Sequence, residues 1–167
     1  MTGTSQNDIA RFLADTKKRV DDLVAKGSWL VLMIGADPGV SPTYSYTVGL
    51  TEHGLPELAV VGLDPRTAQQ VLNRAGDLMR ANGAFRDGQP AHEVIGGNMK
   101  VVFAELPAGS LLHATSRYGA TGYKALQLFW PDKAGLMPWE AGVDPKLAAL
   151  QQQGFDIGRS PPTYQPN

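Results

Sequence analysis

Residues 44–63 have the sequence YSYTVGLTEHGLPELAVVGL, which predicts two strands joined by a short polar loop. In the first strand, residues 44–50, large side chains alternate with Ser, Thr and Gly, so one face is bulky and the other is small and polar. In the second strand, residues 58–63, nearly every residue is apolar, which is typical of a strand at the centre of a sheet. Since the connection is short, we expect the two strands to pair antiparallel.

Further helices and strands are predicted on both sides of this pair. The helices are expected at residues 5–26, 65–82, 107–118 and 144–153, and the strands at residues 29–34, 93–95, 99–106 and 124–130. The strands at 93–95 and 99–106 flank Gly96-Gly97-Asn98, a turn sequence that predicts a hairpin. Helices are missing between most consecutive strands, so a regular doubly wound sheet is excluded.

We therefore predict an α+β fold with a mainly antiparallel (mixed) sheet of about six strands, covered by helices. The expected organisation is a single domain over residues 1–159, followed by a proline-rich tail over residues 160–167.

Composition narrows the classes of function. The chain has 167 residues and a formal net charge of −1, so no general electrostatic attraction to nucleic acid is expected. It has no cysteine, which excludes disulfides and thiolate chemistry and leaves three histidines and the carboxylates as possible metal ligands. The polar N-terminus and the absence of a long apolar run predict a cytoplasmic protein without a membrane span.

A first group of chemically capable side chains follows the first central strand. His53 and Glu57 are four residues apart, a spacing that would place two metal ligands on one face of a helix. Gly54 and Pro56 lie between them, however, and make the segment a loop, so the spacing predicts no metal site. As catalytic candidates, His53 would act as a general base and Glu57 or Asp132 would orient it.

A second group lies at the end of the last predicted strand. Gln127 is within that strand, and its amide either fixes a neighbouring backbone segment or binds a ligand. Two indoles and two carboxylates follow, and they either form a pocket for a cation or flat ring or simply anchor their own loop. They are Trp130, Asp132, Trp139 and Glu140.

A third, weaker group lies on the helix predicted at residues 107–118. His113 and Arg117 are one helical turn apart, and Tyr118 follows, so the three could bind a carboxylate or a phosphate. A spacing of this kind is common by chance. Known nucleotide-binding and hydrolase motifs are absent: the sequence has no GxGxxG between a strand and a helix, no GxxxxGK[ST] and no GxSxG. No cofactor can be assigned.

The two motif-rich segments together resemble a known family. Residues 44–53, with the Pro56-Glu57-Leu58 that follows, residues 125–132 and Pro138-Trp139-Glu140 are similar to the bacterial domain-of-unknown-function family 4262. The resemblance extends over residues 8–142. It implies a single domain but no activity. Many members carry a second histidine where this chain has Leu55, so a function that needs two histidines does not carry over.

Three hypotheses of function remain open. The first is a binding or accessory module for a small molecule or peptide, with a site between the loop after Leu50 and the loop after Trp130. Its lining residues would be Tyr46, His53, Glu57, Arg117, Gln127, Trp130, Trp139 and Glu140. The second is a hydrolase or lyase that uses His53 as general base. The third is a protein-interaction or homo-oligomerisation module that uses the tail from Ser160.

Overall fold

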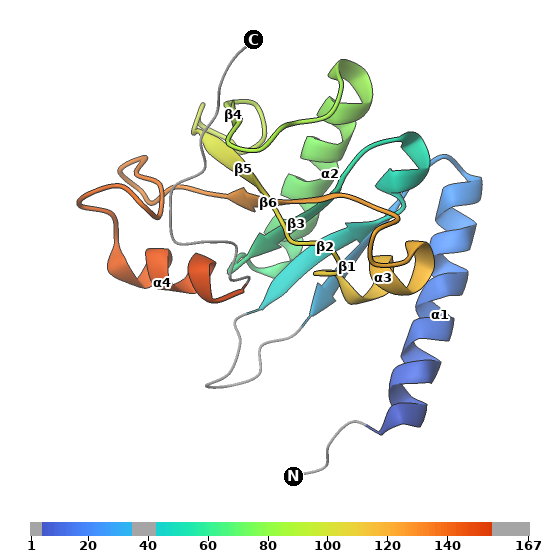
Figure 1. Cartoon of the computed structure of the whole chain (residues 1–167). Helices are drawn as coiled ribbons and strands as arrows, with labels where there is room; N and C mark the ends of the chain where they lie inside the picture. Colours follow the sequence, from blue (N-terminus) through green and yellow to red (C-terminus); the bar gives the residue numbers. More distant parts are fainter. Residues whose placement is uncertain (1–4, 35–42, 155–167) are drawn as a thin grey trace.

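The computed structural model describes residues 5–34 and 43–154, which form four helices and a six-stranded sheet (Figure 1). Residues 35–42 and the predicted proline-rich tail lie outside the described residues. The elements in chain order are α1 (Gln6–Ala25), β1 (Leu30–Ile34), β2 (Tyr44–Val48), the 3-10 turn η1 (Leu50–His53), β3 (Glu57–Val61), α2 (Pro65–Asn82), β4 (Pro90–Ala91), β5 (Val101–Glu105), α3 (Leu112–Tyr118), β6 (Ala125–Phe129) and α4 (Pro145–Gly154).

The sheet has the strand order β1-β2-β3-β6-β5-β4. All neighbouring strands pair antiparallel except β3 and β6, which are parallel, with Glu57 opposite Ala125 and Val60 opposite Leu128. The predicted α+β class and the mixed, mostly antiparallel sheet are therefore confirmed. The apolar strand β3 lies in the interior of the sheet, as its sequence predicts.

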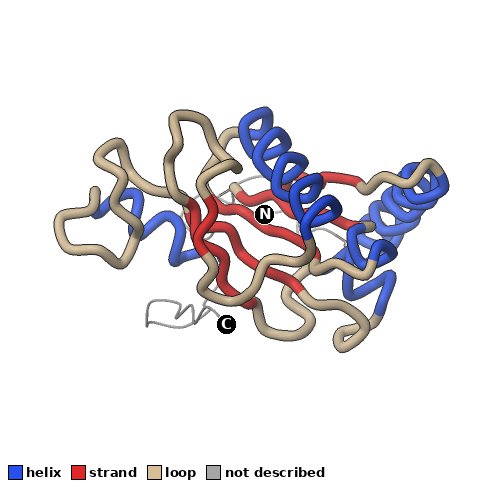
Figure 2. Tube along the Cα trace, turned by 90° about the horizontal axis from the view of Figure 1, so that it is seen from above, coloured by secondary structure: helices blue, strands red, loops and turns tan. Residues whose placement is uncertain are grey.

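Helices cover the two faces of the sheet and build a separate core on each (Figure 2). On one face, α2 contributes Ala68, Val71, Leu72, Ala75 and Met79 to a cluster with Leu58, Val60, Phe103, Leu126 and Leu128. On the other face, α1 and the start of α3 cover a cluster that contains Leu30, Leu32, Tyr46, Val48 and Ala59. The helix α4 lies at the opposite end of the sheet from α1 and α3 (Figure 1).

Local sequence explains where the two longest helices begin. Ser5 and Asp8 form a reciprocal capping box at the start of α1. Asp64 caps α2 by accepting the backbone N–H of Thr67, and Pro65 occupies the first helical position, where it needs no donor. Among the described helices, none has the length and apolar character required to cross a membrane.

Two sequence predictions about strand ends are wrong. The hairpin partner of β5 is β4 at residues 90–91 rather than 93–95, and Val94 is instead buried in the core that α2 covers. Leu50 does not continue the alternation of β2. Gly49, with φ 125°, ends the strand, so Leu50 packs on the α2 face while Val48 packs on the α1 face.

Candidate functional site

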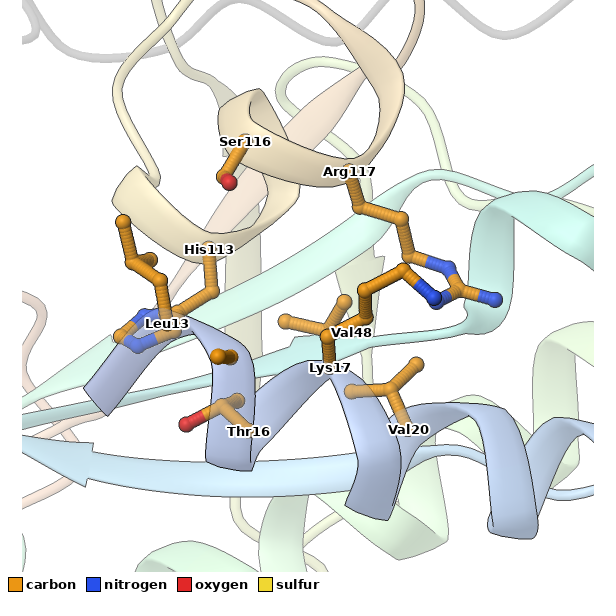
Figure 3. Close-up of a pocket in the computed structure, with 9 residues that line it drawn as sticks. Leu13, Thr16, Lys17, Val20, Val48, His113, Ser116 and Arg117 are labelled. Atoms are coloured by element: carbon orange, nitrogen blue, oxygen red, sulfur yellow. The ribbon is translucent and has the colours of Figure 1, made fainter. Parts of the chain in front are cut away.

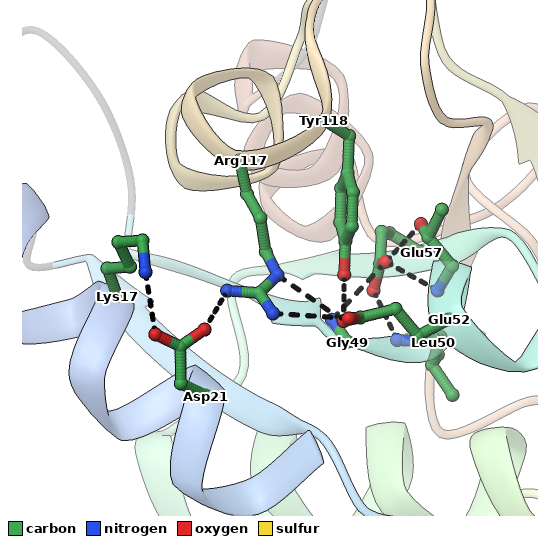
Figure 4. Close-up of polar contacts among 9 residues, drawn as sticks. Lys17, Asp21, Gly49, Leu50, Glu52, Glu57, Arg117 and Tyr118 are labelled. Atoms are coloured by element: carbon green, nitrogen blue, oxygen red, sulfur yellow. Dashed lines mark hydrogen bonds and ion pairs between the residues drawn. The ribbon is translucent and has the colours of Figure 1, made fainter. Parts of the chain in front are cut away.

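Glu57, at the first residue of β3, is fully buried and closes the turn that precedes it (Figure 4). Its Oε1 accepts the Thr47 hydroxyl at 2.8 Å and the Leu50 N–H at 3.1 Å. Its Oε2 accepts the N–H of Gly49 at 3.4 Å and of Thr51 at 2.8 Å, together with the Thr51 hydroxyl. Five donors from the turn thus converge on one carboxylate.

This arrangement makes Glu57 a structural residue of the turn. Burial raises the pKa of the Glu57 carboxyl above its ordinary value, and the hydrogen bonds from Thr51, Thr47 and Leu50 act against that rise by stabilising the charged form. Both oxygens are engaged within the protein, which leaves Glu57 poorly placed to orient a general base or contact a ligand.

His53, the candidate general base, lies apart from this carboxylate. Its side chain is exposed, and its ring stands edge-on to Trp29 with 6.0 Å between ring centroids. Among the described residues, no hydrogen bond joins His53 to Glu57 or to Asp132. Neither of the two carboxylates expected to orient His53 is therefore bonded to it in this structure.

The parallel pairing of β3 and β6 also separates the two loops of the predicted binding site. Glu57 is opposite Ala125, so the loop after Leu50 lies at the N-terminal ends of both strands. Trp130 follows the C-terminal end of β6, which is five residues further along, or about 16 Å at strand geometry. The fold does not bring these two loops into one site, because parallel strands keep their starts and ends at opposite edges.

Gln127 is fully buried and holds α4 against the sheet. Its Nε2 donates to the carbonyl oxygen of Gln151 at 3.1 Å. The Gln151 side chain in turn pairs with the backbone of Trp130, accepting its N–H at 3.0 Å and donating to its carbonyl at 2.7 Å. The amide thus fixes a neighbouring backbone segment, which is the structural alternative offered by the sequence.

The residues after β6 stabilise their own loop. Asp132 accepts backbone N–H groups from Ala134, Leu136 and Asp144. These hydrogen bonds, of which the one from Leu136 has the largest effect, hold the pKa of the Asp132 carboxyl below its ordinary value. Glu140 accepts the N–H of Met137 at 2.7 Å.

The two indoles of this region are also engaged within the protein. Trp130 donates its indole N–H to the carbonyl of Val61 at 2.9 Å. Trp139 packs edge-on against Phe129 at 5.4 Å. With Asp132 and Glu140, they anchor the loop to the sheet.

A cavity of about 290 Å³ lies between α1 and α3, over the end of β2 (Figure 3). Its walls are aliphatic over much of their surface and carry polar side chains from both helices. The residues that line it are Leu13, Ala14, Thr16, Lys17, Val20, Val48, His113, Ser116 and Arg117. Ligand cavities in proteins commonly begin at this size and have this mixed character.

His113 is one of two buried polar residues that line this cavity, with 4% of its surface exposed; Thr16 is the other. The Tyr46 hydroxyl accepts the His113 backbone N–H at 3.3 Å and also bonds the ring Nδ1. The hydroxyl can accept the backbone N–H and donate its own hydrogen to Nδ1, and in that arrangement the neutral ring carries its proton on Nε2. Among the described residues, Nε2 is buried without a hydrogen-bond partner.

Arg117 connects the cavity to the turn that Glu57 closes (Figure 4). Its guanidinium pairs with Asp21 at 2.6 Å and with Glu52 at 3.1 Å, and Glu52 also accepts the Tyr118 hydroxyl at 2.7 Å. Lys17 pairs with the same Asp21 at 2.7 Å. The network joins α1, α3 and η1, so the cavity has a fixed charged edge.

A second, more open hollow of about 610 Å³ lies at the N-terminal ends of β3 and β6. Its charged lining residues are exposed and of both signs: Arg86, Asp87, Glu105 and Lys124. In the described part of the chain, no group of three or more His, Asp or Glu side chains is arranged to hold a metal ion.

Most of the chain matches the model of a known protein family. A family model described as "Domain of unknown function (DUF4262)" matches residues 23–144, which include every strand of the sheet, α2, α3 and the end of α1. The chain belongs to the DUF4262 family. No curated protein and no solved structure matches the chain.

The residues that match the DUF4262 model include only part of the cavity. His113, Arg117 and Val48 lie within residues 23–144, whereas Thr16 and Lys17 on α1 precede it. Sequence reasoning singled out Tyr46 and Arg117 and noted His113 as a weak candidate, but it missed Lys17 and Thr16. No sequence pattern distinguishes these two residues as site residues, because they lie on an ordinary amphipathic helix whose charged side chains usually face solvent.

Proposed function

We propose that this domain binds a small molecule without catalysing a reaction on it, and that the cavity between α1 and α3 is its site. The observation that carries the proposal is His113, which lines a largely aliphatic cavity and whose buried Nε2 lacks a partner among the described residues. A buried polar atom left unpaired costs about 1–3 kcal/mol, so a ligand group that pairs with this nitrogen would recover that free energy.

Binding is favoured over hydrolysis because the proposed catalytic groups serve other contacts. The carboxylates of Glu57 and Asp132 accept several backbone N–H groups each, and His53 is exposed beside Trp29. The proposed binding site lies between α1 and α3, and not between the two loops expected from the sequence. Tyr46 and Arg117 remain site residues, whereas Gln127, Trp130, Trp139 and Glu140 become structural. The oligomerisation hypothesis depends on a tail outside the described residues.

The experiment is a thermal-shift screen of small polar and aliphatic compounds, followed by mapping of amide chemical shifts. We expect hits to shift resonances on α1, α3 and the end of β2. Ala14→Trp should abolish binding, because Ala14 is exposed at the cavity and a large ring there fills the space. Ala10→Trp is the matched control, one turn earlier on the same helix and also exposed. Hits that map elsewhere, or that bind Ala14→Trp normally, would contradict the proposal.

A further inference from the structure

All polar side chains of the α1–α3 cavity can donate a hydrogen bond. Lys17 and Arg117 carry N–H groups and positive charge, and His113 lines the wall with its ring Nε2 buried and, among the described residues, unpaired. The hydroxyls of Thr16 and Ser116 serve as donor or acceptor. No aspartate or glutamate is among the described lining residues. A cationic ligand would find no charged acceptor at these walls, whereas a ligand rich in acceptors would be matched.

The donors are divided between two ends of the cavity. Figure 3 shows the His113 ring at one end and the ends of Lys17 and Arg117 toward the other, with Val48 between them. Lys17 and Arg117 are near each other because both pair with Asp21. The site therefore has a cationic end, whose Lys17 and Arg117 already pair with Asp21 and Glu52, an aliphatic middle and an imidazole end.

An anion can bind at the cationic end with little loss of folding free energy. The Lys17–Asp21 pair is exposed, with 69% and 42% of the two side chains accessible, and exposed pairs of this kind contribute little to stability. Lys17 can therefore turn toward a ligand carboxylate. Arg117 uses three N–H groups in its bonds to Asp21 and Glu52, which leaves two of its five for a ligand.

The volume limits the ligand to a compact one. A cavity of about 290 Å³ holds on the order of ten water molecules, and so a ligand of about ten non-hydrogen atoms. A nucleotide or an extended peptide exceeds this size, whereas a short acyl chain fits.

We infer that the cavity takes a compact aliphatic acid that carries a second oxygen acceptor. Its carboxylate lies between Lys17 and Arg117, its chain crosses Val20 and Val48, and its carbonyl or hydroxyl oxygen accepts the Nε2–H of His113. This inference rests on the proposed function and defines the chemistry of its ligand.

The test uses three probes of matched length: 4-oxopentanoate, pentanoate and methyl 4-oxopentanoate. Affinities are measured by chemical-shift titration of the whole chain. We expect 4-oxopentanoate to bind about tenfold more tightly than either probe that lacks one of its two groups. Lys17→Gln removes the contact to the ligand carboxylate. We therefore expect it to lower the affinity for both acids about tenfold and to leave the affinity for the ester unchanged. Lys18→Gln, the neighbouring exposed lysine, is the control.

The outcomes separate this inference from the proposed function. The inference is wrong if the ester binds as well as the acid, if Lys17→Gln leaves the affinity for acids unchanged, or if screened compounds occupy the cavity while none of the acids does. In each of these cases, binding in the cavity itself still stands. If neither the probes nor any screened compound shifts the resonances of α1 and α3, the proposed function fails as well.

Discussion

The hydroxyl of Tyr46 bonds His113 twice, at its backbone N–H and at its ring Nδ1, and so joins the interior of β2 to the first turn of α3. Both residues are buried, with 1% and 4% of their surfaces exposed. One hydroxyl therefore anchors the ring, and when it donates to Nδ1 the neutral ring carries its proton on Nε2.

Tyr46→Phe should lower the free energy of unfolding by about 1–3 kcal/mol, because it leaves a buried N–H and a buried ring nitrogen without the hydroxyl. Chemical denaturation measures this loss. Long-range ¹H–¹⁵N NMR should find the His113 proton on Nε2 in the native protein and a mixture of tautomers in the variant. Tyr118→Phe is the comparison, since that hydroxyl bonds only the exposed Glu52 and its loss should cost less. A native ring protonated on Nδ1 would contradict the assignment.

The stability of the protein should fall as the pH is lowered below about 6.5. Burial lowers the pKa of His113 beneath its ordinary value of 6.5. Between the two pKa values, the unfolded chain binds a proton at this site and the folded chain does not, so protonation favours unfolding. The stability that neutral His113 contributes to the folded protein is fully present above pH 6.5. It is lost as the pH falls toward the pKa of His113 in the folded chain. An NMR titration of the His113 ring should give a midpoint below 6.5; a midpoint at or above that value would refute this.

His113→Gln provides the control for the pH dependence. Its side chain does not titrate, so the difference in unfolding free energy between pH 7.5 and pH 5.5 should be smaller than in the native protein. An equal difference would assign the effect to other groups.

Glu57→Gln should destabilise the domain although the two side chains have the same shape. The carboxylate accepts five donors, and an amide replaces one acceptor oxygen with an N–H₂ group that faces at least two of them. We expect a loss of about 3 kcal/mol in the free energy of unfolding. Glu93→Gln, at an exposed position, should be close to neutral in the same denaturation experiment. Equal stabilities of the two variants would show that the donors of the turn do not depend on the Glu57 charge.

Gly49→Ala should be strongly destabilising because the turn after β2 requires glycine. Its φ is 125°, and a Cβ there would lie 2.9 Å from the Cβ of Trp29 and 3.0 Å from its Cα. Both backbone strain and overlap contribute, so we expect a loss of more than about 2 kcal/mol, measured by thermal or chemical unfolding. Gly96→Ala is the matched control, since nothing lies within 4 Å of its added Cβ and its φ is not in the positive region. A native-like stability of Gly49→Ala would mean that the turn rearranges.

The candidate site was less predictable than the fold. His53, Glu57 and Asp132 attracted attention because polar residues at strand ends often form sites, yet two of these three bond mainly to their own loops. The outcome could not be read from the chain, because a loop carboxylate that caps a turn has the same sequence signature as one that binds a ligand. His113 was noted only for its spacing from Arg117, and its burial depends on α1 covering α3.

The sequence by itself determined the order of the elements, the central position of β3 and the covering of a mixed sheet by helices. These features follow from hydrophobic periodicity, capping residues and connection length. All three depend on residues that are close together in the sequence. Only the tertiary structure decided which strand ends meet and which side chains share a cavity. Tyr46 and His113 are 67 residues apart, and β3 meets β6 across an equally long stretch of chain. Such contacts depend on how the whole sheet closes, and no local pattern specifies them.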